Sequence, residues 1–78
     1  MSDDPVEISP GITVDRKVRF GKPVVMGTRV DVATVLGLLA AGTSYEELER
    51  EYGLKREGIL AVLRYAADII GQEVVSAH

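Results

Sequence analysis

The sequence predicts a mainly α-helical fold: a three-helix, helix-turn-helix-like (homeodomain-like) unit preceded by a short N-terminal β-hairpin or arm. After residue 31, apolar residues recur at helical spacing in three segments separated by short, glycine-containing turns. Before residue 31, apolar and polar residues alternate in short stretches broken by Pro-Gly and Gly-Lys-Pro turns. A chain of 78 residues is too short to divide, so we expect one domain over 1–78, with the β arm at 5–30 and the tri-helical unit at 31–75.

The β arm is expected to contain several short extended segments. Residues 6–8 and 12–14 alternate between apolar and polar on either side of a Pro10-Gly11 turn, and Val18 to Phe20 repeats the pattern. A short apolar run follows at 24–26. Strands of this length form a hairpin or two, and their unpaired edges favour pairing with a second copy of the chain.

The first two helices have recognisable caps. The first is expected to begin after Asp31, a good N-cap residue, and to end at Gly42, which suits the left-handed C′ position. Ser44 and Glu47 form a capping box at the start of the second helix, because each side chain satisfies an unpaired backbone N–H. Gly53 is expected to close this second helix.

The third helix is expected to run from about Lys55 to Gly71 and as far as Val75. Its expected core stripe consists of Ile59, Val62, Leu63, Ala66, Ile69 and Ile70. Leu60 and Ala67 widen this stripe on one side and Tyr65 on the other, so the apolar arc is wider than two short helices can cover. We therefore expect part of the third helix to contact a partner. The candidate interface residues are Leu60, Arg64, Tyr65 and Ala67.

Composition restricts how so small a domain is stabilised. Small domains commonly rely on disulfides, a metal ion or oligomerisation. The chain has no cysteine and its one histidine is His78, so disulfides are excluded and neither a metal site nor another cofactor is expected. Oligomerisation remains, and the apolar share of 46% supplies surface for it. We expect a homodimer.

The expected location is the cytoplasm. No stretch of the sequence approaches the roughly 20 apolar residues that a membrane span needs. The acidic segment Met1–Pro5 differs from the basic start of a signal peptide.

Charge is segregated along the chain. Five basic residues and no acidic residue lie between positions 16 and 30, whereas the remainder holds four basic and all twelve acidic residues, a net charge of −8. The basic residues of this arm are Arg16, Lys17, Arg19, Lys22 and Arg29. Two interpretations stay open: the arm contacts nucleic-acid phosphates, or its arginines pair with glutamates of the acidic body, within a chain or between subunits.

The helix-turn-helix outline supplies a second nucleic-acid candidate, since Lys55 and Arg56 at the start of the third helix suit phosphates or guanine. However, the face expected to point outwards sums to −1, and the second helix adds four glutamates against one arginine. This outward face is expected to carry Glu57, Ala61, Arg64 and Asp68. A protein-interaction unit is therefore favoured over groove binding by the third helix.

Enzyme motifs are missing from the sequence. It contains no nucleophile–histidine pairing, no His-Glu-x-x-His and no cluster of zinc ligands. Gly21-Lys22 is not a phosphate-binding loop, because Pro23 stands where Ser or Thr would bind the metal. We expect a protein that is not an enzyme.

Four blocks of sequence, at 21–30, 39–48, 51–54 and 61–68, resemble the family catalogued as domain of unknown function 433, and the resemblance covers residues 8–70. Its motif residues here are Gly21, Lys22, Pro23, Gly27, Thr28 and Arg29. The resemblance implies a compact helix-turn-helix-type domain with a short N-terminal β element. Many members are thought to be VapB-like antitoxins encoded beside a PIN-like ribonuclease toxin.

Physical roles can be given to this motif. Gly21 and Gly27 allow backbone geometry that other residues resist, and Pro23 fixes an extended backbone. The forked guanidinium of Arg29 is interpreted as structural, holding carbonyls or a carboxylate at the strand-to-helix corner.

The chain departs from the family pattern in three places. Asp31 stands where members commonly have proline, and Thr13 to Phe20 differs from the shorter, glycine-rich stretch of many members. Only Gln72 to His78 follows the expected last helix, so we do not expect a flexible tail to be laid into a toxin.

The leading hypothesis is an antitoxin-like homodimer that binds a PIN-like nuclease toxin through the helical unit and operator DNA through the basic arm. The alternatives are a stand-alone helix-turn-helix DNA-binding regulator and a structural oligomerisation module.

Overall fold

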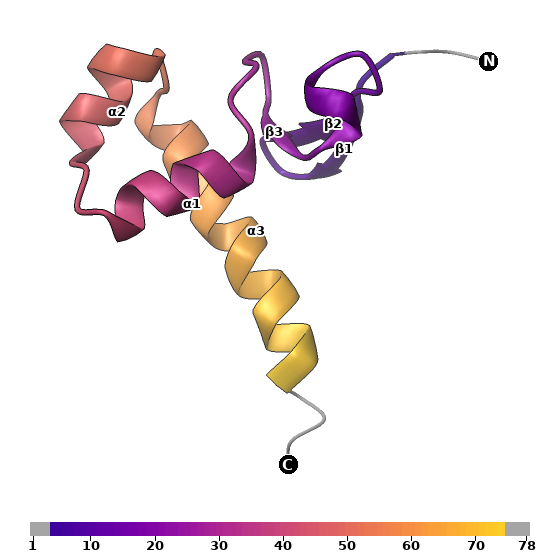
Figure 1. The fold of residues 1–78 in the computed structure, drawn as a ribbon. Helices are drawn as coiled ribbons and strands as arrows, with labels where there is room; N and C mark the ends of the chain where they lie inside the picture. The colour runs from indigo at the N-terminus through magenta and orange to yellow at the C-terminus, as the bar shows by residue number, and fades with distance from the viewer. Residues whose placement is uncertain (1–3, 75–78) are drawn as a thin grey trace.

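Three short strands precede three helices along the chain (Figure 1). The structure, a computed structural model, describes residues 4–74, with side chains described to residue 72. The elements are β1 (Val6–Ser9), β2 (Ile12–Val14), the 3-10 turn η1 (Arg19–Gly21), β3 (Val24–Val25), α1 (Val32–Ala40), α2 (Tyr45–Tyr52) and α3 (Arg56–Val74). A helix-rich fold with a small N-terminal β element was expected, and this part of the prediction is confirmed.

The strands form one antiparallel sheet in the order β1-β2-β3. The β1–β2 hairpin has an irregular register between Glu7 and Ser9, and β3 pairs Val25 with Ile12. β2 and β3 turn apolar side chains into the core, whereas Val6 of the edge strand β1 is 61% exposed. The sheet therefore contributes to the core mainly through its second and third strands.

The expected period-two strand at Val18 to Phe20 is wrong. The chain forms η1 there, Phe20 takes the left-handed φ of 58°, and its side chain is 96% exposed. The cause is a local turn: the Val18 N–H donates to the Asp15 carbonyl at 2.9 Å, and the Lys17 N–H donates to the Asp15 carboxylate at 2.8 Å. Such local hydrogen bonds compete with strand pairing.

The predicted helix caps are confirmed. Asp31 accepts a hydrogen bond from the Thr34 N–H, and Ser44 forms the capping box with Glu47. Gly53 takes the left-handed conformation at the end of α2. α3 begins at Arg56, one residue after the expected start, and is helical through Val74, while the predicted end at Val75 lies outside the described residues. No helix within the described residues is both long and apolar enough to cross a membrane.

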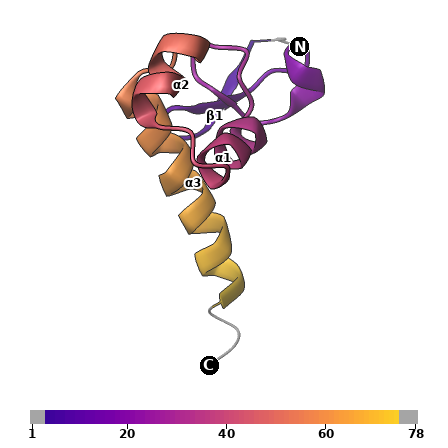
Figure 2. The ribbon, with the colours of Figure 1, turned by 60° about the vertical axis from the view of Figure 1, so that its left-hand side comes forward.

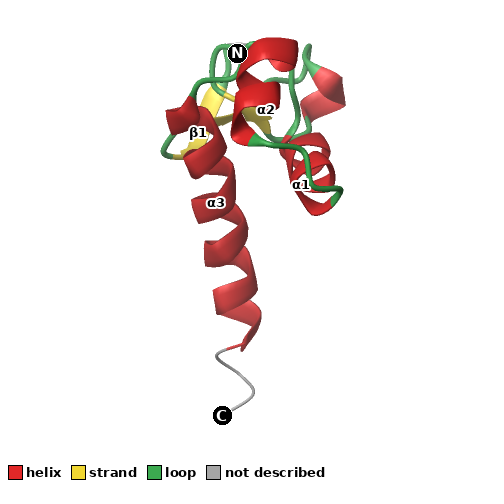
Figure 3. Cartoon of the chain, turned by 90° about the vertical axis from the view of Figure 1, so that its left-hand side faces the viewer, coloured by secondary structure: helices red, strands yellow, loops and turns green. Residues whose placement is uncertain are grey.

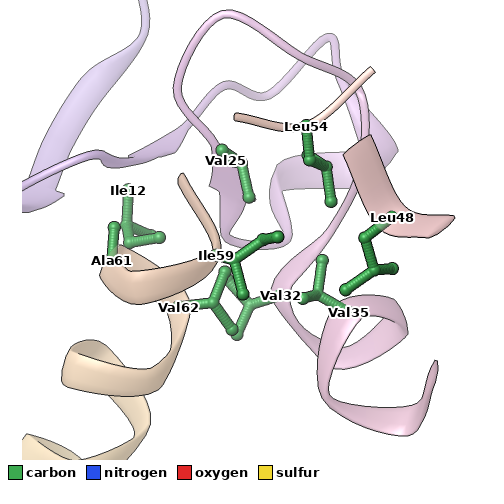
Figure 4. Close-up of a cluster of buried hydrophobic side chains, with 9 residues drawn as sticks. All are labelled: Ile12, Val25, Val32, Val35, Leu48, Leu54, Ile59, Ala61 and Val62. Atoms are coloured by element: carbon green, nitrogen blue, oxygen red, sulfur yellow. The ribbon is translucent and has the colours of Figure 1, made fainter. Parts of the chain in front are cut away.

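The core lies where the sheet, α1 and α2 meet the first half of α3 (Figure 4). Its buried members are Ile12, Val25, Val32, Val35, Leu48, Leu54, Ile59, Ala61 and Val62. Val35 of α1 and Leu48 of α2 lie together on one side of the cluster, and Ile12 lies beside Ala61 on the sheet side (Figure 4). The first half of α3 is thus packed from two directions.

Two sequence-based assignments on α3 are wrong. Ala61, expected to point outwards, is only 4% exposed because β2 packs over it. The expected core stripe is buried only at Ile59 and Val62, whereas Leu63 is 36% exposed and Ile70 57% exposed. Figures 1 to 3 show the reason: the second half of α3 extends away from the sheet and the other two helices.

Close packing between sheet and helix depends on two glycines. A Cβ built at Gly58 of α3 would lie 2.8 Å from Val25 Cγ1, and one built at Gly11 would lie 2.8 Å from Ala61 Cβ. Gly11 also has a φ of +81°, which L side chains rarely adopt. Larger residues at these positions would separate the hairpin from α3.

Replacing Gly58 with alanine is expected to lower the free energy of unfolding by about 1 kcal/mol. Alanine favours a helix over glycine by about 1 kcal/mol, but the added methyl group meets Val25, and overpacking typically costs about 1–3 kcal/mol. The matched control is Gly37→Ala in α1, where an added Cβ meets nothing within 4 Å. That change should be neutral or stabilising. Urea unfolding of both variants measures this, and equal stabilisation by both would contradict the close contact.

Candidate functional site

The second half of the family motif builds a closed turn after β3. The Thr28 hydroxyl donates to the Val25 carbonyl at 2.8 Å and accepts from the Val30 N–H at 3.0 Å. The Val25 N–H donates in turn to the Val30 carbonyl at 3.0 Å. Gly27 has a φ of +78°, as the turn requires. Thr28 is therefore a structural residue whose hydroxyl is already engaged at both its donor and its acceptor positions.

The first half of the motif leads into the corner between the sheet and α1. The Pro23 carbonyl accepts from the Val32 N–H at 2.9 Å, and Val24 forms an isolated bridge with Asp31. Gly21 has the positive φ expected of it, +81°. The Lys22 side chain is exposed. The motif thus consists mainly of residues that fix the path of the backbone.

Asp31 is the most heavily bonded side chain of this corner. It is 5% exposed, and its carboxylate accepts from the Thr34 N–H at 3.2 Å and from the Thr34 hydroxyl at 2.9 Å. Arg19 Nη2 lies 3.2 Å from Asp31 Oδ1. Burial raises the pKa of the Asp31 carboxyl, but the Thr34 hydrogen bonds and the Arg19 charge together lower the pKa below its ordinary value. Asp31 is therefore ionised in the folded protein at neutral pH.

The arginine that holds a carboxylate at the strand-to-helix corner is Arg19, whereas the sequence suggested Arg29. Arg19 is held near the corner by η1 and reaches the buried carboxylate, whereas Arg29 lies in the exposed turn after β3. Within the described residues, no ion pair involves Arg29. Arg29 therefore belongs to the exposed surface of the molecule.

A groove of about 420 Å³ lies between the turn after β3 and the α2–α3 junction. It is lined by Gly11, Val25, Met26, Gly27, Thr28, Gly53, Lys55, Glu57 and Gly58. Its charged lining residues, Lys55 and Glu57, are of opposite sign, and Met26 adds an apolar side chain that is 46% exposed. The hydroxyl of Thr28 is bonded within its own turn. The charges that line this groove therefore sum to zero.

The seven basic candidates differ in their surroundings. Arg19 pairs with Asp31, while Arg56 lies over the Tyr45 ring at 5.1 Å from its centroid and 3.9 Å from the Glu49 carboxylate. The other five candidates have exposed side chains: Arg16, Lys17, Lys22, Arg29 and Lys55. Arg19 therefore pairs within the chain, but with the N-cap aspartate of α1 and not with a glutamate of the acidic body.

The segments that carry these cations lie in the same part of the molecule. The loop around η1, the turn after β3 and the start of α3 all lie away from the C-terminal end of α3 (Figures 1 and 3). The acidic helix α2 lies there too, so this end of the molecule has mixed charge.

The face of α3 that was expected to point outwards, towards DNA, is partly covered. β2 covers Ala61, and Gly58 is half-buried against β3. Arg64 remains exposed further along the helix. The sheet therefore covers Gly58 and Ala61 but leaves Lys55, Arg56 and Glu57 exposed at the start of α3.

Most of the residues expected to contact a partner are exposed. Leu60 is 42% exposed, Arg64 and Ala67 are exposed, and Tyr65 is half-buried against the core. Sequence reasoning placed three further exposed residues in the core: Leu63, Ile69 and Ile70. Two of them, Leu63 and Ile70, form a single strip with Leu60 and Ala67, here called the α3 seam. Its spacing of three, four and three residues was the signal available in the sequence.

The sequence profile of the family described as "Protein of unknown function (DUF433)" matches residues 12–66. The chain belongs to this family. No curated protein and no solved structure matches the chain. In this DUF433 protein the matched span runs from β2 into α3, so it contains the motif turn, the Asp31 corner and the groove. The last two residues of the α3 seam follow it.

Replacing Asp31 with asparagine is expected to lower the free energy of unfolding by about 1.5–3 kcal/mol at neutral pH, the range for hydrogen bonds to charged groups. Asparagine keeps the N-cap but removes the charge that Arg19 faces. Because the folded-state pKa lies below its ordinary value of 3.8, the stabilisation is present above that pH and is lost as the pH falls through the folded-state pKa.

Urea unfolding of the wild type and of Asp31→Asn at neutral pH and near pH 3 measures this effect. The difference between the two proteins should shrink at the lower pH. Arg50→Gln, which removes an exposed arginine from an ion pair on α2, is the control and should change stability little at either pH. An equal difference at both pH values would contradict the charge-based stabilisation.

Proposed function

We propose that this DUF433 protein is a non-enzymatic binding module of the antitoxin type, a homodimer that binds a PIN-like nuclease. One observation carries the proposal: the second half of α3 extends from the body with large apolar side chains that are exposed among the described residues. Ile69 is 41% exposed and Ile70 57% exposed, on different sides of the helix. Exposed apolar surface of this kind is typical of protein-interaction sites.

The groove gives further support to a binding role. Its lining residues supply no nucleophile–base pair, because the Thr28 hydroxyl donates to Val25 and the neighbouring charges are the exposed Lys55 and Glu57. The function proposed for this surface is therefore contact with another macromolecule.

Co-expression with the product of the neighbouring gene tests this function. We expect a stable complex with a PIN-like nuclease and loss of its ribonuclease activity in the complex. Ile69→Glu should weaken the complex at least tenfold, because it places a charge in an apolar contact. The matched control is Gln72→Glu, which adds a negative charge at another exposed position of α3. A neighbouring product unrelated to nucleases, together with no co-purification, would refute the proposal.

A second candidate function is binding of operator DNA, either by the antitoxin itself or by a stand-alone helix-turn-helix regulator. It is favoured by the exposed cations Arg16, Lys22 and Arg29, and by the three-residue connection between α2 and α3. The sheet over Ala61 favours contact through the loops over insertion of α3 into a groove.

Changing Arg16, Lys22 and Arg29 to alanine together should weaken DNA binding and flatten its salt dependence. Removing one cation from a DNA phosphate reduces the slope of log K against log salt by about 1. Fluorescence anisotropy with labelled duplexes from the upstream region of the gene measures this. Arg50→Ala on α2 is the control, since it removes one exposed cation outside the basic arm. Failure to bind DNA at low salt would leave oligomerisation or nuclease binding as the function.

A further inference from the structure

Phe20 is an aromatic residue that lies outside the core, on a loop of basic residues. It is 96% exposed, more than any other large hydrophobic residue that the structure describes. Folded proteins usually bury phenylalanine, because burial of its ring stabilises the fold. The loop around η1, residues 15–22, here called the η1 loop, also contains four basic residues and one acidic residue, a net charge of +3. An exposed ring in such surroundings indicates a contact with a negatively charged partner.

The backbone of the η1 loop holds Phe20 in its exposed position. Arg19 and Phe20 both have left-handed φ values, 53° and 58°, which are uncommon for residues other than glycine. The Lys22 N–H donates to the Arg19 carbonyl at 3.1 Å and closes the turn around Phe20. The ion pair between Arg19 and the buried Asp31 ties this turn to the start of α1. Strained residues that the surrounding structure holds in place are concentrated at binding sites.

Two exposed cations, Arg16 and Lys22, lie on either side of Phe20 along the η1 loop. The ends of the loop meet, since a Cβ built at Gly21 would lie 4.0 Å from Arg16 Cα. The acidic residue of the loop, Asp15, accepts a hydrogen bond from a backbone N–H of its own turn at 2.8 Å. The acidic helix α2 lies on the opposite side of the molecule from η1 (Figures 1 and 2). The surroundings of the ring are therefore positively charged.

We propose that the η1 loop binds single-stranded nucleic acid, with one base stacked on the ring of Phe20 and the neighbouring phosphates held by Arg16 and Lys22. Proteins that bind single strands combine aromatic rings with cations, because every base has a π face and every linkage a negative charge. A base in a duplex is already stacked and is reached only at the cost of unstacking. Phe20 should therefore contribute to binding of single strands and not of a duplex. The inference goes beyond the proposed nuclease contact and uses none of its side chains.

The size of the exposed apolar surface favours a base over a membrane as the partner of the ring. Within the η1 loop, Phe20 is the one exposed large apolar residue, and Val18 is half-buried. Peripheral binding to a membrane depends on a broad apolar face or on two anchoring signals. A single ring with a cation on either side matches one base with a phosphate on either side.

Fluorescence anisotropy of the full chain with short labelled strands of mixed sequence tests the stacking. Phe20→Ala should weaken binding of single-stranded DNA, and of RNA of the same sequence, about fivefold or more, the effect of losing one stacked base. Phe20→Trp keeps a flat ring and should retain the affinity within a factor of about three. An abasic strand carries the same phosphates without bases, so Phe20→Ala should leave its binding unchanged. The same holds for the duplex.

Two further variants separate the ring from the shape of the loop. Phe20→Gly adopts the φ of 58° without strain, so it should fold and still bind single strands as weakly as Phe20→Ala. Tyr52→Ala removes another exposed aromatic side chain, from α2, and should leave binding unchanged within a factor of about two. Circular dichroism of each variant confirms folding.

Three outcomes would overturn the proposal. The first is a wild type that binds no single strand at low salt. The second is a Phe20→Ala variant that loses the abasic strand as strongly as the intact one. The third is binding to phosphatidylserine vesicles that falls with Phe20→Ala while binding of single strands does not, which would assign the ring to a membrane. The chain is measured alone, so failure here and failure of the nuclease complex in co-expression are distinguishable.

Discussion

The contact between the sheet and the first half of α3 determines how the rest of the molecule is arranged. Gly58 lets α3 approach Val25, and Gly11 lets the hairpin approach Ala61, with no side chain on the glycine to hold the two elements apart. This contact places β2 and β3 on one side of α3, while α1 and α2 occupy another side. The core forms between them, around Ile59 and Val62. The sheet does not extend along the second half of α3, where Ile69 and Ile70 are exposed in the part of the chain that the structure describes.

The corner between β3 and α1, where Asp31 lies, connects this arrangement to the loop around η1. A buried carboxylate is costly unless it is paired and hydrogen-bonded, and here it has both Thr34 and Arg19 as partners. One residue therefore caps α1 and ties the loop around η1 to the helical unit. The family motif residues surround this corner and the turn after β3. The family match consequently describes a scaffold, and a scaffold by itself does not specify a partner.

The two candidate contact surfaces lie at different places on that scaffold. The exposed cations and the groove lie around the loops and the start of α3, whereas the exposed apolar side chains lie along its second half. Contacts to nucleic acid and contacts to protein would therefore not compete for the same residues. The exposed apolar surface of α3 is itself in two parts, because Ile69 and the α3 seam lie on different sides of the helix.

The sequence by itself determined the three helices, their caps and the family. These features depend on residues close together in the chain, such as Ser44 with Glu47 or Asp31 with Thr34, so local rules were sufficient. The excess of apolar residues on α3 was also visible as a periodic pattern. Only the tertiary structure decided which of those residues are covered: it buried Ala61 and exposed Leu63 and Ile70. It also gave Asp31 its arginine partner, Arg19. These outcomes depend on where the sheet lies against α3, and that position is set by contacts between residues far apart in the chain, such as Gly11 with Ala61, which no local pattern records.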